Sequence, residues 1–491
     1  MSKYGDYNTE YDVVIAGGGT SGIAAAIGAA RAGAKTLLIE RGGTLGGQFS
    51  VSGPAGFTYA WLFNSKGQQD VGGFAWETYQ RLYKSGHALP HYRPKVRAGS
   101  GYTFAYVDPD WWTFLVCDMM DEEGVDLLYN TVVVDAIMDG DTIKGIVVEN
   151  ADGRVEIKGK IVIDCTGEAY LASKAGVETV MAPEEGFPPH TLCFTVDGVD
   201  WDRFLSYVRT HPDQFSYLHL LSPFADTTKE DIEDFFRNAV DIRQISEIMG
   251  FYELRDAALL NGDWHPYSGV GFFITPKEGG HIQAHMQHSS QVGDCPPTDA
   301  WAISHAIREC RRQNQIAWRF FKNYVPGFEN AYITKMATEI RLREGPRIVG
   351  DYTLKFDDVV EARLHKDVIG KTNFQADSQH VASTDTLNVI AKSNKAHTMP
   401  KDGGSYDIPY RLLVPQKIEN LLTAGKHVSA DSDVYLRYIP QTLVTGQAAG
   451  VAAAICAKKG ITPRELENDV SELQEILIGQ GAILYLEGED R

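Results

Sequence analysis

The chain has 491 residues, of which 43% are hydrophobic and 23% are charged, and these proportions are typical of globular proteins with two or three domains. Its formal net charge of −19 argues against a nucleic-acid-binding surface, because such a surface needs a concentrated positive field. None of the six cysteines forms a Cys-x-x-Cys pair, which excludes a local dithiol redox motif and argues against a zinc or iron–sulfur site.

The sequence does not indicate membrane insertion or secretion. No stretch is long and apolar enough for us to expect a helix that spans a bilayer, and the polar N-terminus lacks the apolar core of a signal peptide. We therefore expect a cytoplasmic protein whose partners include neither a membrane nor a nucleic acid.

A glycine-rich turn after the first predicted strand is the most informative pattern. The apolar run 11–16 leads into Gly17-Gly18-Gly19-Thr20-Ser21-Gly22, which opens a predicted alanine-rich helix over 21–32. Gly17 permits a tight turn, Gly19 lets the main chain approach a pyrophosphate, and Gly22 lets the helix pack on the strand. The N–H groups at the helix N-terminus can donate hydrogen bonds to phosphate oxygens.

An acidic residue completes this pattern. The next apolar run ends at Glu40, eighteen residues beyond Gly22, where a carboxylate can accept hydrogen bonds from a ribose diol. Because the strand, the turn, the helix and the acid all agree, the sequence predicts a site for an adenine dinucleotide rather than an ordinary strand–helix turn.

A glycine-rich and aromatic segment follows, and after it a predicted β-rich unit. Residues 50–105 predict loops and short helices over a cleft. A helix is predicted over 111–121, and strands are predicted over 127–138, 142–148, 155–158 and 161–164. Turns that contain Asp-Gly separate the first three of these strands, and such turns are typical of β-hairpins.

The character of the chain changes between about 180 and 410. Strands are predicted over 192–196, 270–275 and 282–288, and helices over 229–238, 241–260, 298–324 and 333–340. Strand and glycine character return over 411–430, and a helix of small residues is predicted over 442–458. This pattern predicts a nucleotide-binding unit that is split by an inserted unit.

Five segments resemble the two-domain flavoproteins that include glutathione reductase, succinate dehydrogenase and fumarate reductase, and they are most similar to the bacterial FAD-dependent oxidoreductase family. They are the opening turn with Glu40-Arg41 and Leu45-Gly46-Gly47, then 128–133, 163–168, 325–352 and 420–450. The resemblance implies an α/β fold, with a Rossmann-like FAD-binding domain of the glutathione-reductase type and an inserted α+β substrate domain. We assign 1–50, 106–180 and 411–491 to the first domain, and 51–105 and 181–410 to the second.

Three features favour FAD over NAD, which share an adenosine diphosphate half. They are the Gly46-Gly47 loop, the hairpin insertion at 127–158 and the return of the C-terminal segment. Because 45–60 contains no histidine for a covalent link, we expect FAD to bind noncovalently. The predicted FAD contacts are Gly17, Gly19, Thr20, Ser21, Gly22, Glu40, Arg41, Gly46, Gly47, Gln48, Val133, Thr166, Gly167, Gly425, Pro440 and Thr442.

The predicted helix over 442–458 has a physical role in this hypothesis. Reduced flavin carries negative charge near N1 and O2, and a helix N-terminus beside it supplies about half a positive charge together with unpaired N–H donors. The small residues over 446–454 would let the helix lie against the nucleotide domain. The alternative is a packed core helix with no ligand.

Candidate catalytic residues must orient a substrate, move a proton and stabilise negative charge. Arg343 and Arg437 are candidates because a guanidinium can bind a carboxylate or carbonyl with two hydrogen bonds. Arg347 is equally well explained by a structural ion pair with Glu344, Asp351 or Asp357. Tyr435 is a further possible proton donor.

Histidines supply the candidate acids and bases. On a strand, His281, Gln283, His285 and Gln287 would share one face. His285 is the preferred proton-transfer residue and His281 the next, with solvent-facing or core histidines as the alternative. His190 and His427 are further candidates. No carboxylate completes a metal site within this strand, so we predict no metal.

We predict an enzyme, an FAD-dependent oxidoreductase that transfers a hydride between flavin N5 and a small polar organic substrate with an alcohol, an amine or an activated C–C bond. The predicted catalytic residues are His285, Arg343, Arg437 and His281. A fumarate-reductase-like ene-reductase is an alternative, and a tRNA-modifying flavoprotein or an FAD-bearing electron-transfer subunit are alternatives of other classes. The electron donor or acceptor and a homo-oligomeric state stay open.

Overall fold

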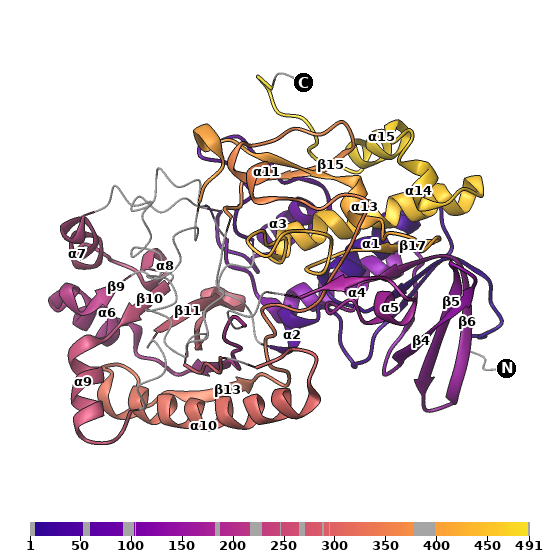
Figure 1. Cartoon of the computed structure of the whole chain (residues 1–491). Helices are drawn as coiled ribbons and strands as arrows, with labels where there is room; N and C mark the ends of the chain where they lie inside the picture. Colours follow the sequence, from indigo (N-terminus) through magenta and orange to yellow (C-terminus); the bar gives the residue numbers. More distant parts are fainter. Residues whose placement is uncertain are drawn as a thin grey trace.

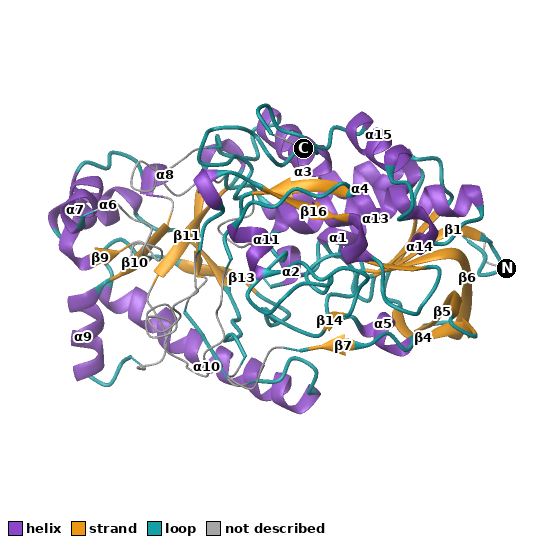
Figure 2. Ribbon diagram, turned by 45° about the horizontal axis from the view of Figure 1, so that its top comes forward, coloured by secondary structure: helices purple, strands orange, loops and turns teal. Residues whose placement is uncertain are grey.

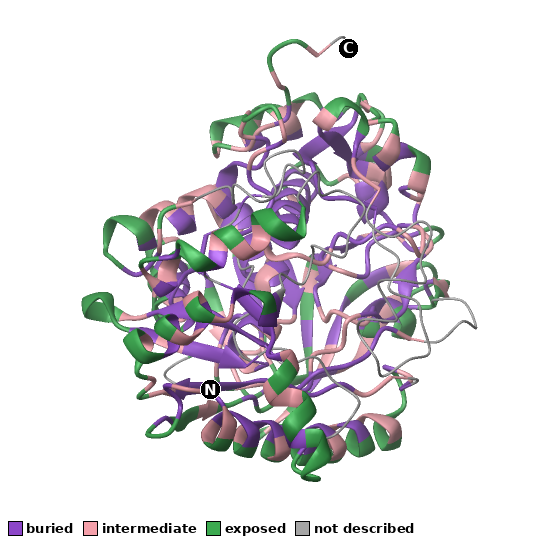
Figure 3. Cartoon of the chain, turned by 90° about the vertical axis from the view of Figure 1, so that its left-hand side faces the viewer, coloured by how far each residue is buried: buried purple, intermediate pink, exposed green. Residues whose placement is uncertain are grey.

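The computed structural model describes residues 5–52, 59–91, 103, 105–181, 187–216, 228–245, 247–264, 271–286, 289–293, 295–376 and 398–489. Two large sheets lie in different halves of the molecule (Figure 1). Figure 2 shows the same two groups of strands with helices around each. Buried residues lie in the interior of the molecule, whereas many exposed residues lie on the outer helices and loops (Figure 3).

The first sheet has seven strands and is largely parallel, as the predicted nucleotide-binding unit requires. Its order is β3-β2-β1-β6-β5-β4, and β17 also pairs with β6. The parallel members are β1 (Tyr11–Ala16), β2 (Thr36–Ile39), β3 (Asp126–Leu128), β6 (Gly153–Asp164) and β17 (Leu421–Thr423). The antiparallel extension is β4 (Val132–Asp139) and β5 (Thr142–Asn150). This α/β arrangement is Rossmann-like.

Two helices that are distant in the sequence pack closely against one another beside this sheet. They are α1 (Thr20–Arg31) and α13 (Ile439–Lys459). A Cβ atom added to Gly446 would lie 2.1 Å from the carbonyl oxygen of Ser21, and one added to Gly450 would lie 2.0 Å from that of Ala25. The small residues of α13 therefore allow its backbone to approach that of α1.

The length and composition of α13 would also suit a membrane span, which corrects the expectation that no stretch is long and apolar enough. However, 94% of its most apolar window is buried inside the protein, as in a core helix.

Further helices and two small sheets lie around the first sheet. The helices are α2 (Gln48–Val51), α3 (Gly73–Lys84), α4 (Pro109–Glu122), α5 (Tyr170–Lys174), α11 (Phe356–Val360), α14 (Pro463–Leu466) and α15 (Ser471–Gly479). Two small antiparallel sheets pair β7 (Thr179–Val180) with β14 (Arg347–Ile348), and β15 (Val368–Thr372) with β16 (Tyr406–Pro409).

The second large sheet has six antiparallel strands in the order β13-β8-β12-β11-β10-β9. The strands are β8 (Phe194–Asp197), β9 (Phe215–Ser216), β10 (Glu247–Gly250), β11 (Gly271–Pro276), β12 (Ile282–Met286) and β13 (Tyr332–Met336). The helices of this half are α6 (Trp201–Thr210), α7 (Lys229–Arg237), α8 (Ile242–Ile245), α9 (Tyr252–Leu260) and α10 (Ala300–Tyr324).

The two faces of the six-stranded sheet differ in polarity. Val196, Ala284 and Ile274 occupy one row of paired positions and belong to an apolar core that includes Phe320 and Phe321 of α10. Because side chains alternate along a strand, their neighbours in sequence face the other way. These neighbours are the polar residues Thr195, Asp197, Gln283, His285 and Thr275, together with Phe273.

The structure corrects several predicted elements, and it joins the predicted strands over 155–158 and 161–164 into β6. Residues 333–340 were expected to be helical, but 332–336 form β13, because pairing with β8 outweighs local helical preference. The expected helix over 241–260 is interrupted by β10, which pairs with β11. The expected strand over 127–138 is broken at Asn130, whose φ of 50° lies in the left-handed region.

Candidate flavin site

The three glycines of the opening turn have different surroundings. A Cβ atom on Gly17 would lie 2.6 Å from the carbonyl oxygen of Cys165, and one on Gly22 would lie 1.9 Å from that of Gly17. A Cβ atom on Gly19 would meet no atom of the described residues within 4 Å. Packing therefore requires Gly17 and Gly22, whereas Gly19 faces open space in which a ligand can approach the main chain.

Two helix N-termini converge beside this space. No side chain caps the N-terminus of α1 at Gly19 or that of α13 at Tyr438, within the part of the chain that the structure describes. The hydroxyl oxygens of Thr20 and Thr442, in the first turns of these helices, lie 2.7 Å apart. Each N-terminus has unsatisfied N–H groups and about half a positive charge, so the pair forms an anion-binding point.

Glu40 lies against the glycine turn, as the sequence predicted. Its Oε2 accepts a hydrogen bond of 2.8 Å from the N–H of Gly18, and its Oε1 accepts one of 2.7 Å from the N–H of Gly42. The predicted adenine strand is adjacent, since the N–H of Glu40 donates to Leu128 and that of Thr131 donates to the carbonyl of Glu40. Val133 follows in β4 and is buried.

The loop after Glu40 returns to the turn. The N–H of Gly46 donates a 2.8 Å hydrogen bond to the carbonyl of Gly18, and Gly46 forms a bridge with Gly19. Gly46 and Gly47 have φ values of 110° and 53°, which favour glycine. Gln48 begins α2, and its Nε2 donates to the carbonyl of Ile340.

The other predicted FAD contacts fall into two groups. Gly425 has a φ of 101°, and a Cβ atom there would lie 2.8 Å from the hydroxyl of Ser21, so it lies against the start of α1. Pro440 lies in the first turn of α13. Thr166 and Gly167 follow β6, where Asp164 accepts from both the N–H and the hydroxyl of Thr166.

Arg41 has a largely exposed side chain that forms an ion pair with Glu339. The structure therefore pairs Arg41 with the segment that follows β13.

Arg343 and Arg437 lie together next to the N-terminus of α13. The Nη1 of Arg437 donates a 2.8 Å hydrogen bond to the carbonyl of Arg343, and its guanidinium stacks on Tyr435, 4.3 Å from the ring centroid. The Nε of Arg343 is buried and has no hydrogen-bond partner, and Arg343 forms no ion pair within the described residues. Burial, Arg437 and then Arg341 lower the pKa of Arg343 to about 10. Arg343 as a whole is half-buried, so a guanidinium that has no carboxylate partner among the described residues can bind an anion here.

Arg347 has the structural role that was its alternative in the sequence. Its Nη2 lies 3.2 Å from Glu344, and its Nη1 donates to the carbonyls of Ala430 and Val434 at 3.1 and 3.0 Å. The hydroxyl of Tyr435 donates to the other carboxylate oxygen of Glu344 at 3.0 Å. Both residues are buried, so Arg347 and Tyr435 hold the backbone that carries Arg437.

The two histidines of the predicted strand have different environments. His285 in β12 is fully buried, and neither ring nitrogen has a partner among the described residues. Burial, and then the charges of Arg341 and Lys335, lower its pKa well below its ordinary value, so the imidazole is neutral. His281 has a side chain that is 53% exposed, and its Nε2 lies 2.8 Å from Asp197.

The Nε2 of Gln283 also donates a hydrogen bond of 2.9 Å to Asp197, so His281 and Gln283 both contact the carboxylate of Asp197. Gln287 lies outside the described residues.

His190 and His427 are both buried and hydrogen-bonded to the main chain. The Nε2 of His190 lies 2.9 Å from the carbonyl of Cys295, and burial lowers the pKa of His190 to about 4, with a smaller contribution from Lys426. The Nε2 of His427 lies 3.1 Å from the carbonyl of Asp164, at the end of β6.

The sequence did not reveal an ion cluster between the two halves. Lys277 Nζ lies 2.8 Å from Asp108 and 2.9 Å from Asp110, and Lys335 Nζ lies 3.0 Å from Asp110. Asp108 also caps α4. The Asp-Pro-Asp pattern at a helix start was a readable signal for the cap, but the lysines follow Asp110 by 167 and 225 residues and no spacing rule connects them.

The comparisons with known proteins agree with this geometry. The family model described as FAD dependent oxidoreductase matches residues 12–477. The chain belongs to this family. FAD is therefore its cofactor, and the predictions of a flavoprotein and of an oxidoreductase are confirmed. The open space at Gly19, the paired helix N-termini and Glu40 suit a dinucleotide diphosphate and ribose.

One curated relative is digeranylgeranylglycerophospholipid reductase 2 of Methanothermobacter thermautotrophicus, which is 30% identical over 201 residues. The match covers 39% of this chain and 48% of the relative, so the chain spans about half the length of that relative.

Solved structures show weaker likenesses. A geranylgeranyl bacteriochlorophyll reductase-like protein from Thermoplasma acidophilum is 13% identical, with 96% of this chain and 87% of that chain covered and a TM-score of 0.46. The OxyS anhydrotetracycline hydroxylase from Streptomyces rimosus is 14% identical, with 96% and 67% covered and a TM-score of 0.42.

Proposed function

We propose that the FAD diphosphate binds at the paired N-termini of α1 and α13, with the adenosine ribose at Glu40. Three observations support this position: the open space at Gly19, the absence of side-chain caps on both helices among the described residues, and the 2.7 Å contact between Thr20 and Thr442. Main-chain N–H groups near Gly19 would hold the phosphates, and the first turn of α13 at Pro440 and Thr442 would face the flavin pyrimidine.

We propose further that the FAD-binding half is of the glutathione-reductase type, with 1–50, 106–180 and 411–491 as one domain and 51–105 and 181–410 as the other. The hairpin β4–β5 between β3 and β6, and the return of the chain in β17, support this division. We also propose a cytoplasmic location, a separate electron donor or acceptor and a homo-oligomeric state.

The reaction we propose is hydride transfer to or from a small polar substrate that carries a negative charge. Bound FAD supplies flavin N5 as the hydride donor or acceptor. The observation that carries the proposal is the unpaired guanidinium of Arg343 beside the start of α13. A substrate carboxylate would accept hydrogen bonds from the guanidinium of Arg343. Arg437 would fix the position of Arg343 by donating a hydrogen bond to its main-chain carbonyl.

His285 is the proposed acid–base residue. Its neutral, buried imidazole has two nitrogens without partners among the described residues, so it could accept a proton from a bound group. His281 is the weaker candidate, because Asp197 already binds its Nε2 and its side chain is largely exposed.

A second candidate function is reduction of a carbon–carbon double bond in a prenyl lipid, with the same cofactor position. The name of the curated relative favours it, since that protein is described as a reductase of a digeranylgeranyl phospholipid. The two functions differ in the size and the hydrophobicity of the substrate, since the phosphate of a phospholipid is also negatively charged.

The test is an anaerobic substrate screen followed by absorbance of the flavin. Oxidised enzyme is mixed with 2-hydroxy acids, amino acids and uncharged alcohols, and reduced enzyme is mixed with enoates and a prenyl phospholipid. We expect a carboxylate to change the flavin oxidation state and Arg343→Ala to slow this step by about 100-fold, the cost of one buried charge-assisted contact, with FAD content unchanged. Arg343→Lys should restore part of the rate.

The control is Arg312→Ala, because Arg312 lies on α10 with an exposed side chain. Uncharged alcohols that react as fast as their carboxylate analogues, together with an unaffected Arg343→Ala enzyme, would contradict the proposal. Reaction with the prenyl lipid alone would favour the second candidate, and electron uptake without any organic substrate would favour the electron-transfer subunit.

A further inference from the structure

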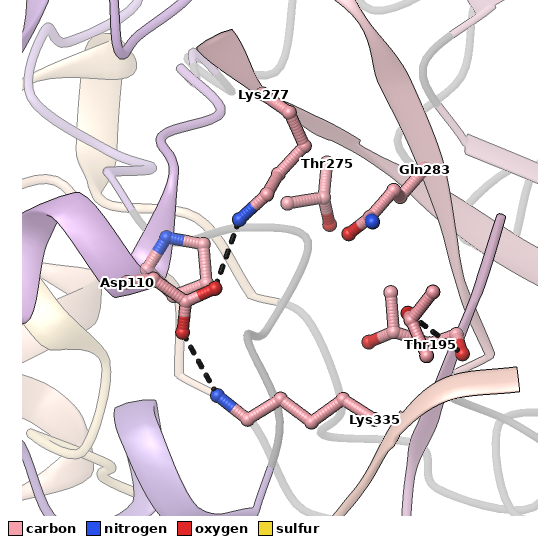
Figure 4. A pocket seen from close by; sticks show the side chains of 8 residues that line it. Asp110, Thr195, Thr275, Lys277, Gln283 and Lys335 are labelled. Carbon is pink, nitrogen blue, oxygen red and sulfur yellow. Dashed lines mark hydrogen bonds and ion pairs between the residues drawn. The ribbon is translucent and has the colours of Figure 1, made fainter.

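A polar cavity of about 260 Å³ lies between the start of α4 and one face of the six-stranded sheet. Seven of its eight lining residues are polar, and none of these eight is aromatic. Figure 4 shows Thr195, Thr275 and Gln283 on one side of the cavity, with Asp110, Lys277 and Lys335 around the other. The cavity shares no lining residue with the glycine turn or with Arg343 and Arg437, and its Thr195 is the cross-strand neighbour of His285.

Two buried threonines line this cavity, and their hydroxyl groups have no hydrogen-bond partner among the described residues. Thr195 and Thr275 are 5% and 4% exposed, yet neither side-chain oxygen makes a hydrogen bond with any residue that the structure describes. Gln283 pairs with Thr275 across β11 and β12, and its Nε2 is fixed by Asp197 at 2.9 Å. The Oε1 of Gln283 is therefore held as an acceptor beside hydroxyl groups that can donate or accept.

The charges around the cavity balance one another. The ammonium of Lys277 contacts Asp108 and Asp110, and that of Lys335 contacts Asp110, so two cations face two carboxylates. Each ammonium has three N–H donors, of which Lys277 uses two and Lys335 uses one on these carboxylates. The remaining N–H groups can donate to a ligand. Asp108 does not line the cavity, but its ion pair with Lys277 leaves this cluster of four charged groups without net charge.

We propose that this cavity binds a neutral, polyhydroxylated molecule no larger than a monosaccharide. Hydroxyl groups both donate and accept, which matches the mixture of Thr hydroxyls, Gln carbonyl and Lys N–H groups. An anion would meet Asp110 and a cation would meet two lysines, so a charged ligand gains nothing from this lining. The volume corresponds to about nine water molecules at liquid density, which limits the ligand to a small polyol. This proposal does not depend on the hydride-transfer proposal.

The test is saturation-transfer NMR on the FAD-loaded enzyme with millimolar probes. The neutral probes are sorbitol, glucose and myo-inositol, and the charged probes of similar shape are gluconate and glucosamine. We expect at least one neutral probe to bind, and Thr275→Val and Gln283→Leu to weaken its binding by about five- to tenfold each, as for a lost hydrogen bond. Lys335→Met is a second route if the buried substitutions reduce the yield of folded enzyme.

Two control variants locate the effect. Thr179→Val makes the same change in strand β7, outside the cavity, and should leave binding unchanged. Arg343→Ala should also leave it unchanged, which separates this cavity from the proposed substrate site. The proposal is overturned if no neutral probe binds, if gluconate or glucosamine binds as tightly, or if Thr275→Val, Gln283→Leu and Lys335→Met all bind as the unaltered enzyme does.

Discussion

The two large sheets offer a ligand different kinds of binding group. At the seven-stranded sheet, the candidate site consists mainly of main-chain N–H groups at the starts of α1 and α13, beside glycines that let backbones approach. At the six-stranded sheet, the polar face consists of side chains from separate strands, such as Thr195, Thr275 and Gln283. Recognition by the main chain needs a fixed local pattern of glycines, whereas recognition by side chains from several strands does not.

The largest expected effect concerns the contact between α1 and α13. Gly446→Ala would place a Cβ atom 2.1 Å from the carbonyl oxygen of Ser21, so the helices must separate. We expect the free energy of unfolding to fall by about 3 kcal/mol, as for overpacking of a rigid core. Urea denaturation measures this change in the free energy of unfolding.

The matched control is Gly479→Ala, in α15, where a Cβ atom would meet nothing within 4 Å among the described residues. Its stability should stay equal or rise slightly. Equal stability losses in the two variants would contradict the close packing of α1 on α13.

The next prediction compares two glycines of the opening turn, of which one is needed for FAD binding and the other for folding. Gly19→Val should leave the apoprotein folded, because its Cβ would point into open space, but should weaken FAD binding by about 100-fold, or ~3 kcal/mol, by blocking the phosphates. Gly22→Val should prevent folding, because its Cβ would lie 1.9 Å from the carbonyl oxygen of Gly17. Flavin fluorescence titration and circular dichroism of the apoproteins distinguish the two. Full FAD affinity in Gly19→Val would place the diphosphate elsewhere.

The same contrast explains what could be predicted from the sequence. The turn at 17–22 and Glu40 are adjacent in space because they are joined by one strand–helix–strand unit, so their spacing alone predicts their contact. The convergence of Thr20 and Thr442 followed only from a family resemblance, because 422 residues separate them. The Lys277 and Lys335 contacts with Asp110 were missed, since they depend on the packing of separately folded segments.

The strand β13 shows the same limit for secondary structure. Tyr332–Met336 was expected to be part of a helix, and its strand conformation depends on pairing with β8, more than 130 residues earlier. The buried state of His285 was likewise not readable from alternation along β12, which predicts a shared face but not what covers it.

An effect no larger than that of Gly446→Ala is expected on acidification, and it should be local to the six-stranded half. The folded-state pKa of His190 is lowered to about 4, so below its ordinary value of 6.5 the unfolded chain gains a proton that the folded chain does not. Stability is therefore lost as the pH falls from about 6.5 towards 4, by up to ~3 kcal/mol from this residue. His285 acts in the same direction.

Hydrogen exchange at pH 7 and pH 5 should show greater loss of protection in β8 and β12 than in β1, and His190→Gln should reduce this difference. A local measurement is needed because burial raises the pKa of Asp70 to about 6, which shifts the global stability in the opposite direction. Equal loss of protection in β1 would contradict a local origin.

The smallest effect is expected at the contact between the halves. Asp110→Asn removes the ion pairs with Lys277 and Lys335, but the Asp110 side chain is 50% exposed, so the expected loss of unfolding free energy is about 0.5–1 kcal/mol. Urea denaturation at low and high salt measures it, and the difference from the unaltered enzyme should shrink at high salt. A salt-independent loss would indicate that packing, not charge, is responsible.

A crystal structure of the FAD-bound enzyme tests the central claim most directly. We expect the diphosphate oxygens to lie about 3 Å from main-chain nitrogens near Gly19, with the flavin pyrimidine edge facing the first turn of α13 at Thr442. A diphosphate bound away from both helix N-termini, or a flavin remote from α13, would contradict the account.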